Sequence, residues 1–201
     1  MAKLYFRYGA MNSGKSTALM QVAHNYEEQG MRVLILKPKV DTKGSGDLVS
    51  RLGVRRPADL LVPPDMDLVE AVRAASSEGR PLACVLCDES QFLTAEQAEQ
   101  LFMVTVELNI PVICYGLRAD FKGDLFPGSE ALLVMADKIE EVKTICWCGK
   151  KAAFNARFDS RGRVVKEGEQ VVLGANDRYT SLCRRHWMAG DLGPDFHIRR
   201  T

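Results

Sequence analysis

The sequence predicts an α/β fold with a mostly parallel central sheet, followed by a small second unit toward the C-terminal end. Two observations predict this class. Over residues 1–141, short apolar runs alternate with segments of helical spacing, which is typical of strand–helix units in a parallel sheet. From about residue 142 the chain becomes rich in cysteine and glycine, which indicates a unit held by something other than a large core.

In the first half of the sheet unit, predicted strands alternate with a predicted helix. Residues 4–8 form a run that predicts a strand, and apolar residues three or four positions apart over 15–29 predict a helix. The uninterrupted apolar run 33–36 is typical of a strand that is buried on both faces. Residues 41–53 are polar and rich in glycine, so we expect a mobile loop there.

The second half of this unit repeats the pattern. We expect a helix over 68–77, a strand over 82–87, a helix over 95–108 and a strand over 112–115. Thr94 precedes the second of these helices, and its hydroxyl is a suitable N-cap. Strands that alternate with helices in this way predict the mostly parallel sheet.

Composition and charge exclude several classes of protein. The chain has 201 residues, of which 46% are apolar and 26% charged, so it has enough apolar side chains for a packed core. Its 27 Lys and Arg nearly equal its 26 Asp and Glu, which argues against a protein that holds nucleic acid mainly through phosphates. We see no apolar stretch long enough to span a membrane and no signal peptide. We therefore expect a cytoplasmic protein without a nucleic-acid or membrane partner.

Five of the six cysteines fall into two groups, one on a predicted strand and one with the spacing of a metal site. In a reducing compartment, metal-binding or core roles are more common than disulfides. Cys84 and Cys87 are three residues apart on a predicted strand, so their side chains point to opposite faces and cannot share one metal. We interpret both as core residues.

A second group of donors has the spacing of a metal site. Two cysteines one residue apart are followed much later by Cys-x-x-His, which gives the set Cys146, Cys148, Cys183 and His186. Four such donors suit a closed tetrahedral zinc site, which would be structural because no coordination position is left open. The alternative is a small apolar cluster of free thiols.

The string between the first strand and the first helix matches G-x-x-x-x-G-K-S. Its glycines allow consecutive backbone N–H groups to face one point, and the helix N-terminus adds its positive dipole end there. We therefore expect residues 9–16, here called the phosphate loop, to bind the phosphates of ATP, with Lys15 at the terminal phosphates and Ser16 on Mg²⁺. The loop consists of Gly9, Ala10, Met11, Asn12, Ser13, Gly14, Lys15 and Ser16.

Two acidic residues follow the strand predicted over 82–87. Asp88 is placed to organise Mg²⁺, and Glu89 can face the transferred phosphate, because ligands collect at the carboxyl ends of parallel strands. A carboxylate there accepts the proton of a substrate hydroxyl in a kinase, or polarises water in an ATPase. The pair alone does not distinguish these two reactions.

Several strings together resemble the zinc-containing, RecA-like thymidine kinases, in particular their bacterial branch. The matching strings are GAMNSGKSTALM, DESQFL, CYGLRADFKGDLF, ICWCGKKA and LGANDRYTSLCRRHW. The resemblance implies a RecA-like P-loop domain with a small zinc-ribbon or lasso domain. We expect the boundaries 1–141 for the first, 142–190 for the second, and a C-terminal tail over 191–201.

The resemblance also implies a reaction, the transfer of the γ-phosphoryl group of ATP to the 5′-hydroxyl of thymidine to give dTMP. It assigns Glu89 as general base, Asp88 and Gln91 to ATP and Mg²⁺, and Phe121 as the ring that stacks on thymine. Further nucleoside-binding residues are implied at Met11, Phe92, Leu117, Phe126, Val171, Val172, Leu173, Gly174 and Tyr179. Core packing is the alternative for Phe92, Leu117 and Phe126. It is also the alternative for Phe121, although the neighbours Asp120 and Lys122 are a polar context for a core residue. The family is commonly tetrameric and inhibited by dTTP.

One departure and two alternative functions stay open at this stage. The family often has Asp-x-Arg after its second strand, where this chain has Asp41-Thr42-Lys43, and Arg51 is another candidate cation. A RecA-like P-loop ATPase that acts on nucleic acid would also combine a phosphate loop, an acidic pair and a zinc site. A regulatory nucleotide-binding module without turnover is the third interpretation.

Overall fold

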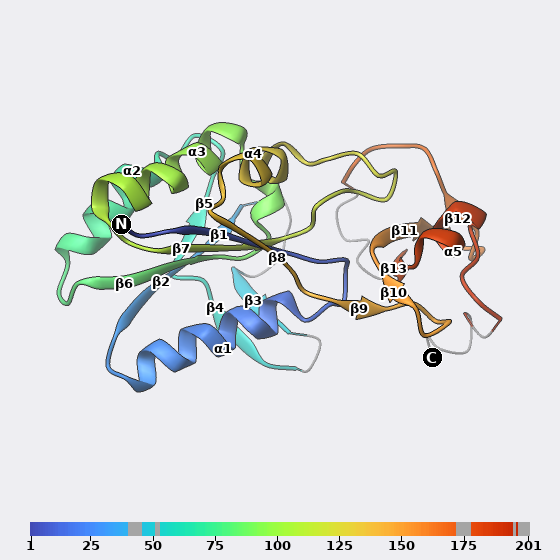
Figure 1. The fold of residues 1–201 in the computed structure, drawn as a ribbon, viewed down its shortest axis with the longest axis horizontal. Helices are drawn as coiled ribbons and strands as arrows, with labels where there is room; N and C mark the ends of the chain where they lie inside the picture. The colour runs from blue at the N-terminus through green and yellow to red at the C-terminus, as the bar shows by residue number, and fades with distance from the viewer. Residues whose placement is uncertain (40–45, 51–52, 172–177, 195, 197–201) are drawn as a thin grey trace.

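The structure is a computed structural model that describes residues 1–39, 46–50, 53–171, 178–194 and 196. A larger part contains the central sheet with its helices, and a smaller part lies beyond one end of the sheet (Figure 1). The described part of the chain contains no helix that is long and apolar enough to cross a membrane.

The central sheet has six strands, all parallel, in the order β5-β2-β6-β7-β1-β8. The α/β class and the parallel sheet predicted from the sequence are therefore confirmed. Because the strands are parallel, their carboxyl ends share one edge, and the phosphate loop and the Asp88–Glu89 pair both lie there. The strands are β1 (Leu4–Tyr8), β2 (Arg32–Pro38), β5 (Leu60–Val62), β6 (Leu82–Cys87), β7 (Val112–Gly116) and β8 (Lys138–Glu141).

Helices cover both faces of the sheet (Figure 1). One face carries α1 (Lys15–Glu28), and the other carries α2 (Leu68–Ser77), α3 (Ala95–Met103) and α4 (Pro127–Met135). Strand residues alternate between the two cores, so that Cys84 packs with the α1 side and Cys87 with the opposite side. Both thiols are fully buried, which confirms their interpretation as core residues.

The third predicted helix begins as expected and ends early. The Thr94 hydroxyl accepts a hydrogen bond from the Gln97 N–H in a capping box, which confirms the N-cap. The prediction of one α-helix over 95–108 is wrong beyond Met103, because Val104–Leu108 forms a π-helical turn. Three consecutive β-branched residues, Val104 to Val106, favour the change, because such side chains crowd a helix. The Thr105 hydroxyl also donates a hydrogen bond to the Phe102 carbonyl.

One short strand interrupts the segment that we expected to be a loop, and its partner strand follows that segment. β3 (Asp47–Val49) pairs antiparallel with β4 (Arg55–Pro57), so the expectation of a loop over 41–53 is wrong for 47–49. The fully buried Leu48 packs into the core on the α1 side, which stabilises the hairpin. Asp41, Lys43 and Arg51 lie outside the described residues.

The second unit consists of short antiparallel strands and one helix. β9 (Thr144–Ile145) pairs with β10 (Lys151–Ala152), and a three-stranded sheet has the order β12-β11-β13. Its strands are β11 (Phe154–Phe158), β12 (Val164–Val165) and β13 (Tyr179–Leu182), and the helix is α5 (Arg184–Ala189). Its core is small and contains two of the cysteines together with Leu192 and Phe196 from the segment separated above as a tail.

Candidate functional site

The phosphate loop is a tight turn between β1 and α1. Gly14 is the N-cap of α1 and has φ 84°, a left-handed conformation that glycine adopts without strain. A Cβ atom on Gly9 would lie 2.4 Å from the Val142 carbonyl oxygen and 2.5 Å from Ser13 Oγ. Only glycine therefore fits at this position. The N-terminus of α1 begins at this turn, and the first backbone N–H groups of a helix can bind an anion such as a phosphate.

Lys15 is held inside this loop. Its side chain is buried, and its Nζ donates hydrogen bonds to the carbonyls of Gly9 at 3.2 Å and Ala10 at 3.0 Å. Burial lowers the pKa of the Lys15 ammonium, while the nearby carboxylates of Glu89 and Asp88 act in the opposite direction. The structure thus brings the predicted cation and both predicted acids together at one end of the sheet.

Asp88 ends β6 with its side chain buried. Burial and the neighbouring Glu89 carboxylate raise the pKa of Asp88 to about 6, against a hydrogen bond from Ser16 that lowers it. Its Oδ1 atom has no hydrogen-bond partner among the described residues. A buried carboxylate oxygen without a partner, next to a hydroxyl and a phosphate loop, fits the oxygen donors that Mg²⁺ prefers.

Glu89 adopts an unusual backbone conformation at the turn after β6. Its φ is 49°, a left-handed value that few residues other than glycine adopt and that is often found at functional sites. A short 3₁₀ helix, Ser90–Phe92, follows it. The Gln91 amide donates a 2.6 Å hydrogen bond to Glu89 Oε2, and its own carbonyl oxygen accepts the Leu117 N–H at 3.0 Å.

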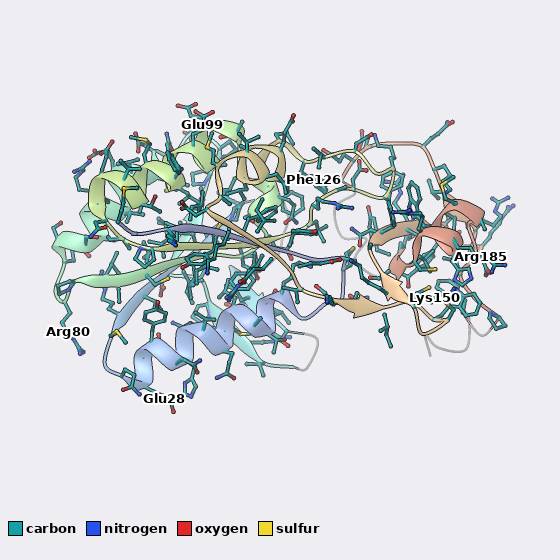
Figure 2. All side chains as sticks on the ribbon, viewed as in Figure 1. Glu28, Arg80, Glu99, Phe126, Lys150 and Arg185 are labelled. Carbon is teal, nitrogen blue, oxygen red and sulfur yellow. The ribbon has the colours of Figure 1, made fainter. Side chains whose placement is uncertain are left out.

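The predicted nucleoside-binding residues are partly brought together. The rings of Phe92 and Phe126 meet edge to face with centroids 5.8 Å apart, and Phe126 lies where the sheet unit faces the second unit (Figure 2). Phe121, the residue expected to stack on thymine, is only 1% exposed. A base that stacks on this ring must therefore displace the atoms that cover it.

The remaining nucleoside-binding predictions fall in and around the second unit. Tyr179 is half-buried on β13, where it pairs with Arg157 of β11. Val171 lies in an irregular segment. Val172, Leu173 and Gly174 lie outside the described residues.

The second unit contacts the phosphate loop directly through residues that sequence reasoning missed. Asn155 Oδ1 accepts the Met11 N–H at 2.8 Å, and the Ser181 hydroxyl donates to the Met11 carbonyl. The Asn155 amide also donates to the Ala119 carbonyl at 3.2 Å. Asn155 therefore ties together the phosphate loop, β11 and the segment that leads to Phe121. Its signal in the sequence was weak, because β11 was not predicted.

The predicted metal ligands converge on one point. The ligand atoms of Cys146, Cys148, Cys183 and His186 all lie within 4.8 Å of one another. The sulfur–nitrogen distances from Cys146 and Cys183 to His186 Nδ1 are 3.4 and 3.5 Å, and the Cys148–Cys183 sulfur distance is 3.9 Å.

These distances agree with a tetrahedral zinc site. Zinc bonded to sulfur and nitrogen at its usual lengths separates two sulfurs by about 3.7 Å and a sulfur from a nitrogen by about 3.6 Å. A hydrogen bond from the backbone N–H of His186 lowers the pKa of the Cys183 thiol, and a lower pKa favours the thiolate that binds metal. The Trp147 ring stacks on His186 with centroids 4.2 Å apart and covers the site.

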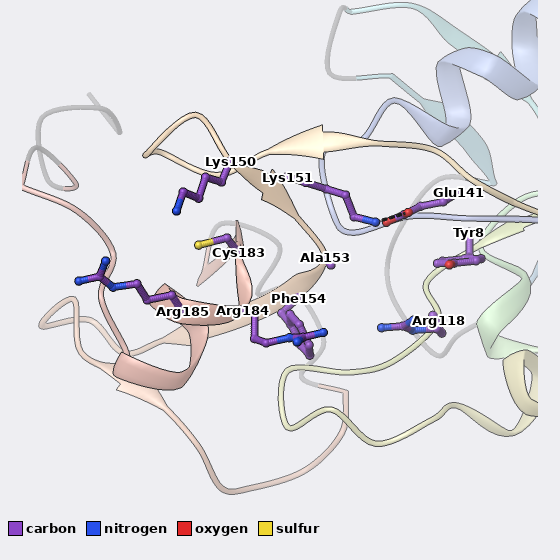
Figure 3. Close-up of a pocket in the computed structure, with 10 residues that line it drawn as sticks. All are labelled: Tyr8, Arg118, Glu141, Lys150, Lys151, Ala153, Phe154, Cys183, Arg184 and Arg185. Carbon is purple, nitrogen blue, oxygen red and sulfur yellow. Dashed lines mark hydrogen bonds and ion pairs between the residues drawn. The ribbon is translucent and has the colours of Figure 1, made fainter.

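A separate cavity of about 420 Å³ opens between the second unit and the ends of β1 and β8 (Figure 3). Its charged lining comes mainly from cations, including Arg118, Lys150 and Arg184. The Glu141 carboxylate pairs with one of them, Lys151. No residue of the phosphate loop lines this cavity, and neither Asp88 nor Glu89 does, so it is distinct from the candidate catalytic site.

The chain is similar to known proteins of one family. The family whose sequence model matches residues 2–187 is described as thymidine kinase. A thymidine kinase of Ruegeria pomeroyi is 48% identical over 200 residues, which is 98% of this chain and 100% of the relative. A thymidine kinase of Salmonella typhimurium is 52% identical over 188 residues, covering 93% of this chain and 91% of the relative. One of Yersinia pestis is 51% identical over 188 residues, covering 93% and 95%.

Proposed function

The chain belongs to the thymidine kinase family of ATP-dependent phosphotransferases, and we propose that the site around Glu89 transfers the γ-phosphoryl group of ATP to the 5′-hydroxyl of thymidine. The observation that supports this location best is the convergence of Lys15, Asp88 and Glu89 at the carboxyl edge of the sheet. The product of the reaction is dTMP, a precursor for DNA synthesis by salvage.

The phosphate loop binds and orients the phosphates in this proposal. Its backbone N–H groups and the Lys15 ammonium face the transferring phosphoryl group, where negative charge must be stabilised. Ser16 and Asp88 hold Mg²⁺, which neutralises phosphate charge when it is bound. A phosphate near Lys15 also provides the buried ammonium with an anionic partner.

Glu89 acts as the general base. Gln91 donates to one carboxylate oxygen, Oε2, so that Oε1 can accept the proton of the 5′-hydroxyl. The 5′ oxygen of thymidine attacks the γ-phosphorus as it loses this proton. The bond between the γ-phosphorus and the bridging oxygen breaks, and ADP leaves with the electron pair. The left-handed backbone at Glu89 supports this role, because strained residues concentrate at functional sites.

The nucleoside lies between the sheet unit and the second unit in this proposal. Phe121 stacks on the base, and the surrounding apolar wall comes from Met11, Phe92, Leu117, Phe126 and Tyr179. The backbone of 171–174 meets the polar edge of the base. Two hydrogen bonds support this location, because they hold the two units together around it: Asn155 accepts from the Met11 N–H, and the Ser181 hydroxyl donates to the Met11 carbonyl.

Zinc has a structural role in this proposal. Its four protein ligands leave no open position for a substrate, and the second unit has a small core that gains stability from metal binding. We divide the chain into a kinase domain, 1–141, a zinc-binding lasso domain, 142–190, and a tail, 191–201. The packing of Leu192 and Phe196 in the core of the second unit suggests that the tail contributes to that domain.

Assembly, inhibition and location complete the proposal. We propose a homotetramer inhibited by dTTP, as the family resemblance implies, in the cytoplasm. The edge strand β8 supports contacts between copies, because Ile139 on it is 45% exposed and Val134 on the preceding helix is 80% exposed.

A coupled assay of ADP release tests the proposed reaction. The purified protein is supplied with ATP, Mg²⁺ and one of thymidine, deoxyuridine, deoxycytidine, deoxyguanosine or buffer alone. We expect ADP release that depends on thymidine, with dTMP as the product. Equal release in buffer alone would contradict the kinase and would favour the ATPase alternative, which a further sample containing DNA then tests.

A further inference from the structure

We propose that Arg157 is a positioning residue for the nucleoside, because it fixes the plane of the Phe121 ring and ties the segment 167–169 to it. This inference rests on the proposed role of Phe121 in stacking the base. Arg157 lies in β11, and no motif of the sequence assigned it a role.

The first contact that carries the proposal is on the ring. The guanidinium carbon of Arg157 lies 4.0 Å from the centroid of Phe121. Arg157 is 9% exposed and Phe121 is 1% exposed, so water does not weaken the attraction between the cation and the ring. A guanidinium is planar and can cover the face of an aromatic ring, which an ammonium cannot do.

The second contact is with the backbone of residues 167–169, which precede the segment 171–174 proposed to meet the base. Arg157 Nη1 donates to the Glu169 carbonyl and Nη2 to the Glu167 carbonyl, both at 2.9 Å. Gly168 lies between them with φ 116°, and a Cβ atom there would be 2.6 Å from Arg157 Nη2. The turn therefore closes tightly around the guanidinium and requires glycine, which shows that the arginine is part of its structure.

The charge of Arg157 has no acidic partner here. The described residues place no carboxylate in an ion pair with its guanidinium, which instead contacts two carbonyls and one ring. The backbone of Phe121 is held separately, because Trp187 Nε1 donates to its carbonyl at 3.1 Å. What remains for Arg157 to fix is the ring itself.

The position of Arg157 on β11 relates it to the phosphate loop. Side chains two apart on a strand share a face, so Asn155 and Arg157 point the same way, about 6.6 Å apart along β11. Asn155 contacts Met11 of the phosphate loop. The guanidinium at Phe121 and the amide at Met11 therefore come from one face of one strand, so β11 positions both the ring and the phosphate loop.

The test measures steady-state kinetics and zinc content in variants of Arg157 and in a control variant. Arg157→Met keeps much of the apolar stem but removes the plane and its donors, and we expect the KM for thymidine to rise by about tenfold. We expect the KM for ATP and the zinc content to stay at wild-type values. Arg163→Met is the matched control, because it removes an arginine of the same unit that pairs with Asp159 and does not contact Phe121.

Arg157→Lys separates charge from shape and also provides a second variant if Arg157→Met loses zinc or fails to fold. Lysine keeps the charge but lacks the planar fork, so we expect it to raise the KM for thymidine by at least about threefold with kcat little changed. A zinc-loaded Arg157→Lys protein with a wild-type KM for thymidine would overturn the proposal.

A double variant shows whether Arg157 acts through Phe121. In a Phe121→Leu background, adding Arg157→Met is expected to change the KM for thymidine by less than about twofold. If the double variant instead shows the product of the two single-variant increases in the KM for thymidine, the two residues act independently and the coupling is overturned. If Phe121→Leu alone leaves the KM unchanged, the proposed stacking role of Phe121 fails; if it raises the KM while Arg157→Met does not, only the role of Arg157 fails.

Discussion

The side-chain amide of Gln91 donates a 2.6 Å hydrogen bond to Glu89 Oε2 while its carbonyl oxygen accepts the backbone N–H of Leu117. Gln91 is almost completely buried, so this amide has a fixed orientation. It connects the turn after β6 to the residue that follows β7. The direction of the Glu89 carboxylate is thereby set by the relative position of two neighbouring strands of the central sheet.

Replacing Glu89 tests its role as the base. Glu89→Gln keeps the size of the side chain but removes its capacity to accept a proton, so we expect kcat to fall by at least about 10²-fold. The affinity for ATP, measured by calorimetry, should stay within a few-fold, because the phosphate loop is unchanged. Glu96→Gln, in the exposed first turn of α3, is the control that should keep full activity. A near-normal kcat in Glu89→Gln would exclude it as the base.

Gly116 tests whether the connection through Gln91 matters. A Cβ atom there would lie 2.7 Å from Ser90 Oγ, 2.8 Å from Gln91 Oε1 and 3.0 Å from the Gln91 backbone nitrogen. Because the Gln91 backbone cannot move freely, we expect Gly116→Ala to lower kcat by about tenfold and the free energy of unfolding by about 1–3 kcal/mol.

The control for Gly116→Ala is Gly79→Ala, which strains the backbone without a contact to the site. Gly79 has φ 71°, and a Cβ atom added there would meet no atom of the described residues within 4 Å. Gly79→Ala should therefore lower stability by about 1 kcal/mol through backbone strain while kcat stays at the wild-type value. Equal kcat values for the Gly116→Ala and Gly79→Ala proteins would contradict a link from β7 to Glu89.

The parts of the site that the sequence predicts are those encoded by consecutive residues or by donor chemistry. The phosphate loop and the Asp88–Glu89 pair each lie within one turn, so a short string is sufficient to locate them. The metal ligands are far apart along the chain, but three thiols and an imidazole have few other uses as a set.

The contacts that sequence reasoning missed depend on tertiary structure. Asn155 and Met11 are 144 residues apart, and Arg157 on β11 contacts Phe121 from the other unit. Neither residue type marks such a role by itself. The sequence also did not predict β8, because its residues KIEE contain no apolar run. This edge strand is stabilised by its pairing with β1, which is a tertiary contact.

The core thiols should be unreactive in the folded protein. Burial raises the pKa of the Cys84 thiol to about 12, so that only about 10⁻⁴ of it is thiolate at pH 8. We expect iodoacetamide at pH 8 to leave Cys84 unmodified in the native protein and to modify it after denaturation, as measured by mass spectrometry of peptides. Modification of native Cys84 as fast as that of an unfolded thiol would mean that this part of the sheet opens readily.

Removal of zinc should weaken thymidine binding because α5 connects the metal site to Phe121. Trp187 follows the ligand His186 on this helix, and its indole N–H donates to the Phe121 carbonyl at 3.1 Å and the Asn155 carbonyl at 3.0 Å. We expect one zinc ion per chain by elemental analysis, and a Cys183→Ser variant with less zinc, a lower Tm and a higher KM for thymidine.

Cys84→Ser is the matched control for the loss of zinc, because it makes the same chemical change at a buried thiol in the other unit. It should lower the Tm through an unfavourable buried hydroxyl and still retain a full complement of zinc. The comparison isolates the effect of the metal site, because general destabilisation affects both variants while zinc content changes in only one. A zinc-free protein with the wild-type Tm and KM for thymidine would contradict both the structural zinc and its connection to Phe121 through Trp187.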